Sequence, residues 1–165
     1  MRRLILLRHA KTERQAASGA DFDRALTERG WSDGARTAQA LAAAGLVADL
    51  ALVSTAVRAR QTFEAAQPFL PDVRLTLESN LYNAAPETLL NAARGADGDT
   101  VLVIAHNPGV HALAMELAER ALCEPTIRRD LEAGFPTATA AAFEFGDGRI
   151  GCLGTFGPNR AGPID

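Results

Sequence analysis

The sequence predicts an α/β fold of three layers, with a mostly parallel sheet between two layers of helices and an antiparallel hairpin at its C-terminal end. Short apolar runs alternate along the chain with segments whose apolar residues recur at helical spacing, which is typical of parallel sheets covered on both faces. Near the C-terminus, two apolar runs are separated only by Gly146-Asp147-Gly148, which indicates a hairpin. The 165 residues can form one compact domain with a sizeable core. We therefore expect a single domain over 1–165, with a frayed Gly/Pro-rich end at 157–165.

Each element has a local signal of its own. Apolar, partly β-branched runs predict strands at 3–8, 49–53, 73–77, 100–105, 138–145 and 149–156. Apolar residues at helical spacing predict helices at 31–44, 57–69, 86–94 and 108–122. Thr27 and Pro108 can open two of these helices, because Thr accepts from free N–H groups and Pro has none to satisfy, and Gly45 can close the first helix. Residues 10–25 and 123–136 are expected to be irregular.

Charge and composition narrow the classes of function. The net charge of −3 and the pI near 5.6 argue against a protein that binds nucleic acid or anionic membranes. The apolar run before Arg8 is too short for a signal peptide or a membrane span. Cys123 and Cys152 match no metal or redox spacing, so we expect two reduced thiols in a cytoplasmic protein. We further expect this protein to be a monomer.

Three apolar runs are followed by side chains that can bind an anion. Arg8 and His9 follow the first strand, Arg58 follows the second, and His106 follows the fourth. In open α/β sheets, ligands bind at the carboxyl ends of the strands. If these strands are neighbours, two imidazoles and two guanidinium groups meet there. Guanidinium groups match phosphate oxygens bidentately, and the helix that opens at Pro108 adds backbone N–H donors. The sequence therefore predicts a phosphate site.

Such a site gives a histidine a chemical role. Nearby arginines lower the pKa of an imidazole, and a neutral imidazole has a lone pair that can attack phosphorus. The arginines then stabilise the charge on the equatorial oxygens during transfer. The sequence therefore predicts a covalent phosphohistidine, which water later hydrolyses to inorganic phosphate. This chemistry needs no metal and no cofactor, and we expect neither.

Five motifs support this prediction, and they occur in the order Leu7-Arg8-His9-Ala10, Leu26-Thr27-x-x-Gly30, Val53-Ser54-x-x-x-Arg58-Ala59-x-Gln61-Thr62, Leu81-Tyr82-Asn83-Ala84 and His106-Asn107-Pro108-Gly109. In these motifs the chain resembles the histidine phosphatases, which have phosphoglycerate mutase and acid phosphatase relatives, and most closely the small SixA-like phosphohistidine phosphatases. The resemblance implies a phosphoglycerate mutase-like fold and a phosphatase with His9 as its nucleophile. It implies that the phosphoryl group is held by Arg8, Arg58 and His106. Further polar pocket residues are then expected at Thr12, Gln15 and Asn107.

The chain departs from the family in two places. Ala10 follows the nucleophile where the family usually has glycine, so we expect an ordinary backbone conformation there. Asn80 stands where many relatives carry an acid that protonates the leaving group, and Glu78 is the possible substitute. An imidazole leaves phosphorus more readily than an alkoxide and depends less on an acid. The loops are also short, which leaves the crevice open. Both points favour phosphohistidine on a partner protein, such as a phosphorelay carrier, as the substrate.

Other interpretations stay open. Taken singly, His9 could end a strand, His106 could cap a helix and Arg58 could be a solvated charge. A zinc pair of His106 and His111 does not fit, because they are five residues apart and a helical pair has a spacing of four. Tyr82 is expected to pack rather than to bind a ligand. Two rival functions remain: a phosphatase or mutase of small phosphate esters, and a catalytically idle protein that binds phosphate.

Overall fold

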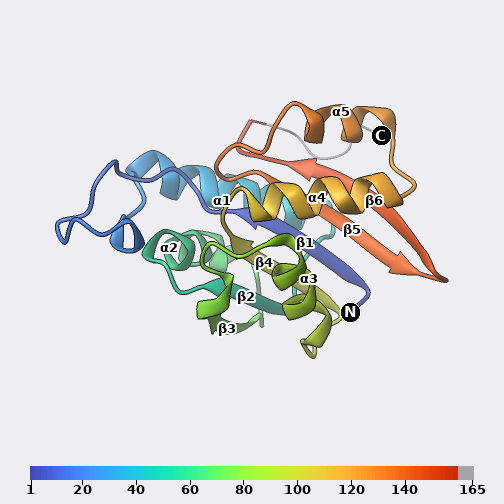
Figure 1. The fold of residues 1–165 in the computed structure, drawn as a ribbon, viewed down its shortest axis with the longest axis horizontal. Coiled ribbons are helices and arrows are strands. Elements are labelled where there is room, and N and C mark those ends of the chain that lie inside the picture. Colours follow the sequence, from blue (N-terminus) through green and yellow to red (C-terminus); the bar gives the residue numbers. More distant parts are fainter. Residues whose placement is uncertain (160–165) are drawn as a thin grey trace.

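The computed structural model describes residues 1–159 and contains a six-stranded sheet in the order β3-β2-β4-β1-β5-β6 (Figure 1). The strands are β1 (Arg3–Arg8), β2 (Leu50–Ser54), β3 (Arg74–Glu78), β4 (Thr100–Ala105), β5 (Ala140–Gly146) and β6 (Arg149–Phe156). The first four are parallel, whereas β5 is antiparallel to both β1 and β6. The predicted α/β fold with a C-terminal hairpin is confirmed. The end expected to fray, 157–165, lies outside the described residues from residue 160 onward.

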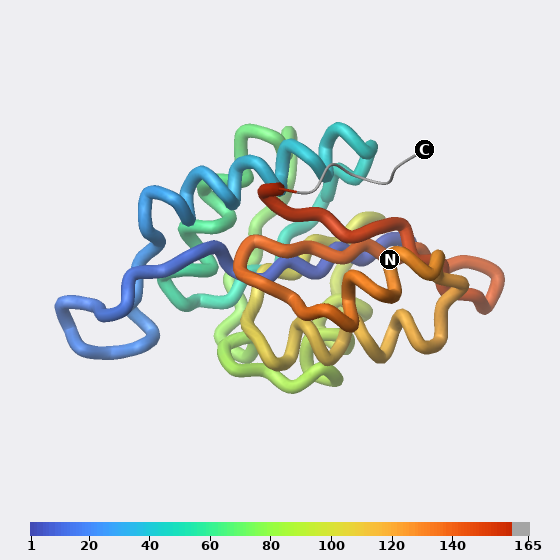
Figure 2. Tube along the Cα trace, turned by 90° about the horizontal axis from the view of Figure 1, so that it is seen from above, coloured from blue at the N-terminus to red at the C-terminus, as the bar shows by residue number. Residues whose placement is uncertain are grey.

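The helices form two layers, one on each side of the strands (Figure 2). One layer contains α1 (Glu28–Ala43) and α2 (Val57–Ala66), and the other contains α3 (Pro86–Gly95), α4 (Gly109–Arg120) and α5 (Pro125–Glu132). A hydrophobic core lies on each face of the sheet, and alternate residues of β1 point into one core or the other. Leu4 and Leu6 pack with the layer of α3 to α5, and Ile5 and Leu7 pack with α1 and α2. Since both faces are covered, the strand ends are the part of the sheet that can reach a ligand. No helix within residues 1–159 is long and apolar enough to cross a bilayer.

The segment 123–136 differs from the expectation of an irregular chain, because it contains α5. Only Ile127 and Leu131 of this helix contact the core. The residues between them, 128–130, are all charged. One apolar pair in eight residues is a weak periodic signal, and the helix is therefore recognisable only from its packing.

Cys123 and Cys152 form a disulfide with their Cα atoms 4.9 Å apart, so the expectation of two free thiols is wrong. The pairing follows from backbone contacts that the sequence pattern does not show. The Leu122 N–H donates to the Ile150 carbonyl (2.9 Å), and the Cys152 N–H donates to the Leu122 carbonyl (3.1 Å). These bonds hold the start of the α4–α5 connection against β6. The expectation of a cytoplasmic protein was based on two reduced cysteines, and the disulfide takes away that basis.

Gly109, the first residue of α4, lets the start of this helix lie close to the segment that precedes α3. A Cβ atom at this position would lie 2.0 Å from the carbonyl oxygen of Ala84. We expect Gly109→Ala to lower the free energy of unfolding by roughly 1–3 kcal/mol, because backbone must move to admit the methyl group. Urea unfolding measures this change. Gly95→Ala is the matched control. Apart from its chain neighbours and the nearby backbone of its own helix, no atom lies within 4 Å of a Cβ added at this position. An equal loss of stability in both variants would contradict this prediction.

Candidate active site

The sheet order places the ends of β1 and β4 side by side, and their following residues, His9 and His106, meet there. The centroids of the two imidazole rings are 5.2 Å apart. Both residues are buried, as is Arg58 near the start of α2. Arg8, the last residue of β1, is close enough for its charge to lower the pKa of both imidazoles. The structure therefore brings together the four residues that the sequence singled out for chemistry.

His9 has one ring nitrogen that is free to act as a nucleophile. Its Nδ1 lies 2.8 Å from the Ala10 carbonyl oxygen, which can only accept, so Nδ1 carries the proton and donates it. In the neutral ring, the lone pair is therefore on Nε2. The Ala10 N–H donates to Thr62 Oγ1 (2.9 Å), and the Thr62 hydroxyl donates to the Arg58 carbonyl (2.7 Å). Thr62 thus fixes the backbone that carries His9 against the helix that carries Arg58.

Burial is the main reason why the pKa of His9 falls to about 4. The hydrogen bond to Ala10 opposes this shift, and the charges of Arg58 and Arg8 add to it. At neutral pH, the imidazole is therefore uncharged and retains its lone pair.

His106 makes its hydrogen bond through Nε2. Its Nε2 lies 2.7 Å from Ser54 Oγ, and Ser54 Oγ also accepts from the Ala56 N–H (3.4 Å). In the tautomer in which the Ser54 hydroxyl donates to Nε2, the neutral His106 ring carries its proton on Nδ1 and can donate it to an anion. Burial, followed by the charge of Arg58, lowers the pKa of His106 to about 3. His106 is thus uncharged at neutral pH.

Three buried nitrogens of this cluster that can donate a hydrogen bond have no partner among the described residues: Arg8 Nε, Arg58 Nε and His106 Nδ1. An outer nitrogen of each arginine is engaged, since Arg8 Nη1 donates to the Phe135 carbonyl (3.0 Å) and Arg58 Nη1 donates to the Asp21 carbonyl (2.8 Å). Leaving a buried donor unpaired costs about 1–3 kcal/mol. Three such donors beside a neutral imidazole form a site that an oxyanion would satisfy.

Asp21 and Tyr82 lie at the rim of this cluster and were not singled out as site residues. Asp21 Oδ2 accepts from Arg58 Nη2 (3.0 Å) and from the Tyr82 hydroxyl (2.8 Å). The Tyr82 ring stands edge-on to His106, with centroids 5.4 Å apart. Tyr82 was expected only to pack, but its hydroxyl bonds to Asp21 and its ring contacts His106. Asp21 belongs to the 3₁₀ turn Asp21–Asp23 inside the loop 10–25. This loop has no periodic pattern, so its position beside the site could not be predicted from the sequence.

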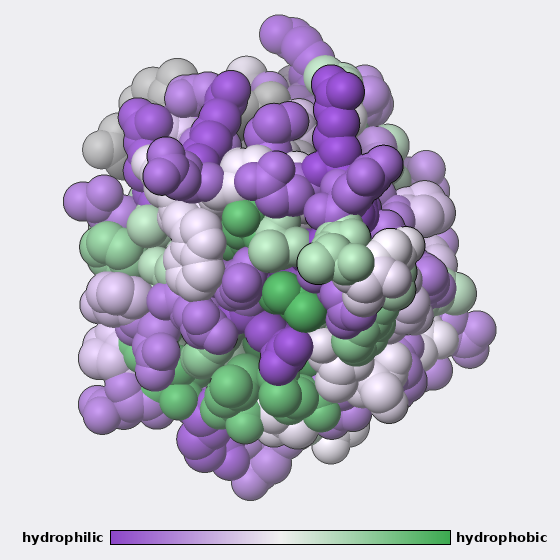
Figure 3. Space-filling view, turned by 90° about the vertical axis from the view of Figure 1, so that its left-hand side faces the viewer, coloured by the Kyte–Doolittle hydropathy of each residue, from purple (hydrophilic) through white to green (hydrophobic). Residues whose placement is uncertain are grey.

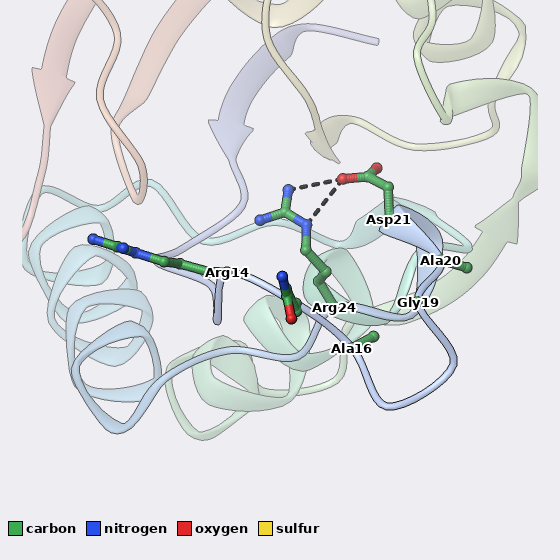
Figure 4. Close-up of a pocket in the computed structure, with 7 residues that line it drawn as sticks. Arg14, Ala16, Gly19, Ala20, Asp21 and Arg24 are labelled. Atoms are coloured by element: carbon green, nitrogen blue, oxygen red, sulfur yellow. Dashed lines mark hydrogen bonds and ion pairs between the residues drawn. The ribbon is translucent and has the colours of Figure 1, made fainter.

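A shallow pocket of about 460 Å³ adjoins the rim and is lined by Asp21, Arg24, Arg14, Gln15 and three small residues (Figure 4). The Arg24 side chain points toward Asp21, and its Nε donates to Asp21 Oδ1 (2.9 Å). Figure 3 views the end of the molecule from which this loop projects, and hydrophilic side chains gather on its upper part. The pocket beside the rim is therefore lined mainly by polar and charged side chains.

Comparisons with known proteins agree with this geometry. Residues 4–85 match the histidine phosphatase superfamily (branch 1). An uncharacterized protein of Mycobacterium tuberculosis is 32% identical over 157 residues, which cover 92% of this chain and 97% of that protein. The chain belongs to the histidine phosphatase superfamily. A protein of Agrobacterium tumefaciens assigned as the phosphohistidine phosphatase SixA is 32% identical over 93% of this chain and 96% of its own, with a TM-score of 0.81. The chain is thus a SixA-like phosphatase, as the motifs indicated.

The fold of this histidine phosphatase also extends to distant relatives. Phosphoglycerate mutase from Plasmodium falciparum is 17% identical over 91% of this chain and 87% of its own, with a TM-score of 0.58. At this identity the likeness concerns the fold alone, and the phosphoglycerate mutase-like architecture that the resemblance implied is confirmed.

The remaining predicted site residues stay predictions, and the structure places them as follows. Thr12 Oγ1 accepts from Arg24 (2.8 Å), so it supports the loop that carries Asp21. Gln15 is exposed in the adjoining pocket. The Asn107 amide donates to the Phe135 carbonyl (3.0 Å), the same group that Arg8 engages.

Glu78, the possible acid, ends β3 opposite Ser54 in register. Its side chain forms no hydrogen bond or ion pair with another residue in the described part of the chain. Within residues 1–159, no three His, Cys, Asp or Glu side chains cluster as a metal site would require.

The two depressed histidine pKa values make the stability of this phosphatase depend on pH. An unfolded chain protonates these imidazoles near pH 6.5, whereas the folded protein does so near 4 and 3. Between pH 6.5 and about 4 the unfolded state binds more protons, so the free energy of unfolding rises with pH and is lost as the pH falls. We expect a loss of about 2 kcal/mol per imidazole between pH 7 and pH 5.

Urea unfolding of wild type and His9→Asn at these two pH values measures the contribution of His9. The variant should lose less stability than wild type on acidification. An identical pH dependence in the two proteins would contradict the prediction.

Proposed function

We propose that this phosphatase removes the phosphoryl group from phosphohistidine on a partner protein through a covalent phosphohistidine on His9. One observation carries the proposal: the lone pair of His9 Nε2 lies in a cluster with three buried nitrogens that can donate a hydrogen bond and have no partner within residues 1–159. A tetrahedral oxyanion next to Nε2 would satisfy these donors.

The reaction proceeds in two displacements. His9 Nε2 attacks phosphorus, and the bond from phosphorus to the substrate's ring nitrogen breaks. Arg8, Arg58 and His106 donate to the equatorial oxygens while charge spreads over them. Water then attacks the phosphorus of phospho-His9, which releases inorganic phosphate and returns His9 to its neutral form.

Two features of the chain favour phosphohistidine over a phosphate ester. Asn80 cannot protonate an alkoxide, and a general acid typically contributes 10²–10⁴-fold to such a step. An imidazole leaving group lacks that requirement. The similarity to the SixA-assigned protein of Agrobacterium tumefaciens supports the same substrate class.

A substrate comparison tests the proposal. We expect kcat/KM for a histidine-phosphorylated carrier protein to exceed that for phosphoserine peptides and sugar phosphates by about 100-fold or more. His9→Ala, assayed in parallel, shows that the turnover arises at this site. Equal or faster turnover of the esters would favour a small-ester phosphatase, and no turnover of any substrate would favour an idle phosphate-binding protein.

A further inference from the structure

Asp21 puts a negative charge at the rim of a site built for an anion. Its side chain is 53% exposed and is held by Arg58, Arg24 and the Tyr82 hydroxyl. A carboxylate in this place repels the phosphoryl group of any substrate. The same charge is favourable if the group attached to phosphorus is a cation or a hydrogen-bond donor.

The leaving group of the reaction passes this rim. His9 is only 6% exposed, so it attacks from the floor of the site. In-line transfer places the leaving atom on the side of phosphorus away from His9, toward solvent. Asp21 and Tyr82 lie on that side, because Arg58 reaches Asp21 with its outer nitrogens while its buried Nε stays unpaired.

The Tyr82 hydroxyl is the acceptor that this rim offers. The hydroxyl donates its proton to Asp21 Oδ2 (2.8 Å). No described residue donates a hydrogen bond to the hydroxyl oxygen, so its lone pairs can accept one from a substrate. A carboxylate that accepts from a hydroxyl makes the hydroxyl oxygen a better acceptor in turn. Asp21 itself is less available, since both of its oxygens already accept from Arg58, Arg24 and Tyr82.

We propose that Tyr82, polarised by Asp21, accepts a hydrogen bond from the distal ring N–H of the substrate's phosphohistidine and so holds the leaving imidazole in its protonated form. This inference rests on the proposed phosphohistidine substrate. Tyr82 contacts the substrate, and Asp21 is a positioning residue that acts through it.

The step balances without a separate acid. The bond between phosphorus and the substrate nitrogen breaks, and its electron pair stays on that nitrogen. A new bond forms between phosphorus and His9 Nε2. The distal nitrogen keeps its proton throughout, so a neutral imidazole leaves rather than an imidazolate. Neither Glu78 nor Asn80 is needed in this step.

The charges around the pair fit this role. The hydrogen bond from Tyr82, followed by the bond from Arg24 and the charge of Arg58, lowers the pKa of Asp21 to about 2. Asp21 is therefore an anion at any pH at which His9 is neutral. The charged and titratable groups that face the pair are Arg24, Arg58, His106 and, deeper in the site, Arg8 and His9.

The test compares two phosphoryl donors in single-turnover phosphorylation of the full chain. We expect Tyr82→Phe and Asp21→Asn to slow phosphorylation by a phosphohistidine protein roughly ten- to hundred-fold. Phosphorylation by p-nitrophenyl phosphate should change little, because nitrophenolate leaves without a proton. The alkaline limb of the phosphohistidine rate should also move to lower pH in both variants, since the bound imidazole then loses its proton more readily. Asp23→Asn is the matched control, because Asp23 lies in the same 3₁₀ turn and bonds to Ser18.

The outcomes separate this inference from the proposed function. If wild type accepts phosphohistidine but each variant loses the same factor with both donors, or loses nothing, the role of Tyr82 and Asp21 is wrong and the proposed function stands. An unmoved alkaline limb also overturns the inference. If wild type takes no phosphoryl group from phosphohistidine, both proposals fall.

Discussion

Replacement of His9 by alanine should lower turnover of every substrate by roughly 10⁴-fold or more, because the variant has no nucleophile beside the phosphate donors. Binding of inorganic phosphate should stay mostly intact, since Arg8, Arg58 and His106 remain. Steady-state kinetics gives the first quantity, and isothermal titration with phosphate gives the second.

The third histidine of the chain supplies the control for this variant. His111 lies on α4, where its Nε2 donates to the Leu131 carbonyl (2.8 Å). His111→Ala should turn over substrate at nearly the wild-type rate. If His9→Ala also keeps the wild-type rate, His9 is not the nucleophile.

Loss of Arg58 should weaken both binding and turnover. We expect Arg58→Ala to cost about 2 kcal/mol or more in phosphate binding, the size of one charge-assisted contact. The rate should fall further, because Arg58 also holds Asp21 through two hydrogen bonds. Phosphate titration and kcat/KM for a phosphohistidine protein measure the two effects.

Arg60→Ala is the matched control for Arg58, since Arg60 lies two residues further along α2 and is exposed. It should change neither quantity. Arg58→Lys should recover only part of the loss, because an ammonium group lacks the planar fork of a guanidinium. Wild-type phosphate affinity in Arg58→Ala would contradict the assignment.

The fold was largely predictable because its signals are local. Each core strand is a short apolar run, and Thr27 caps α1 through a bond from the Gly30 N–H (3.0 Å). The two elements that were missed depend on distant contacts. Half of the residues of α5 are charged, and the helix is held in place by packing Leu131 into the core. The disulfide forms because the backbone at Leu122 pairs with β6.

The candidate site divides in the same way. His9 and His106 directly follow apolar strands, so they meet once those strands are neighbours in a parallel sheet, as β1 and β4 are. Asp21 was not predictable, because the loop 10–25 has no periodic pattern and its carboxylate is placed by Tyr82, 61 residues away. Ser54 was quoted within a motif, but its hydrogen bond to His106 Nε2 appears only in the structure.

The most direct measurement is the chemical identity of the phosphorylated enzyme. The full chain is exposed briefly to a labelled phosphohistidine protein, quenched, tested for acid and alkali stability, and digested to locate the label. A covalent intermediate on His9 predicts label that is lost in acid, survives alkali and maps to the peptide containing His9. Label that survives acid, or that maps to His106 or Ser54 instead, would contradict it.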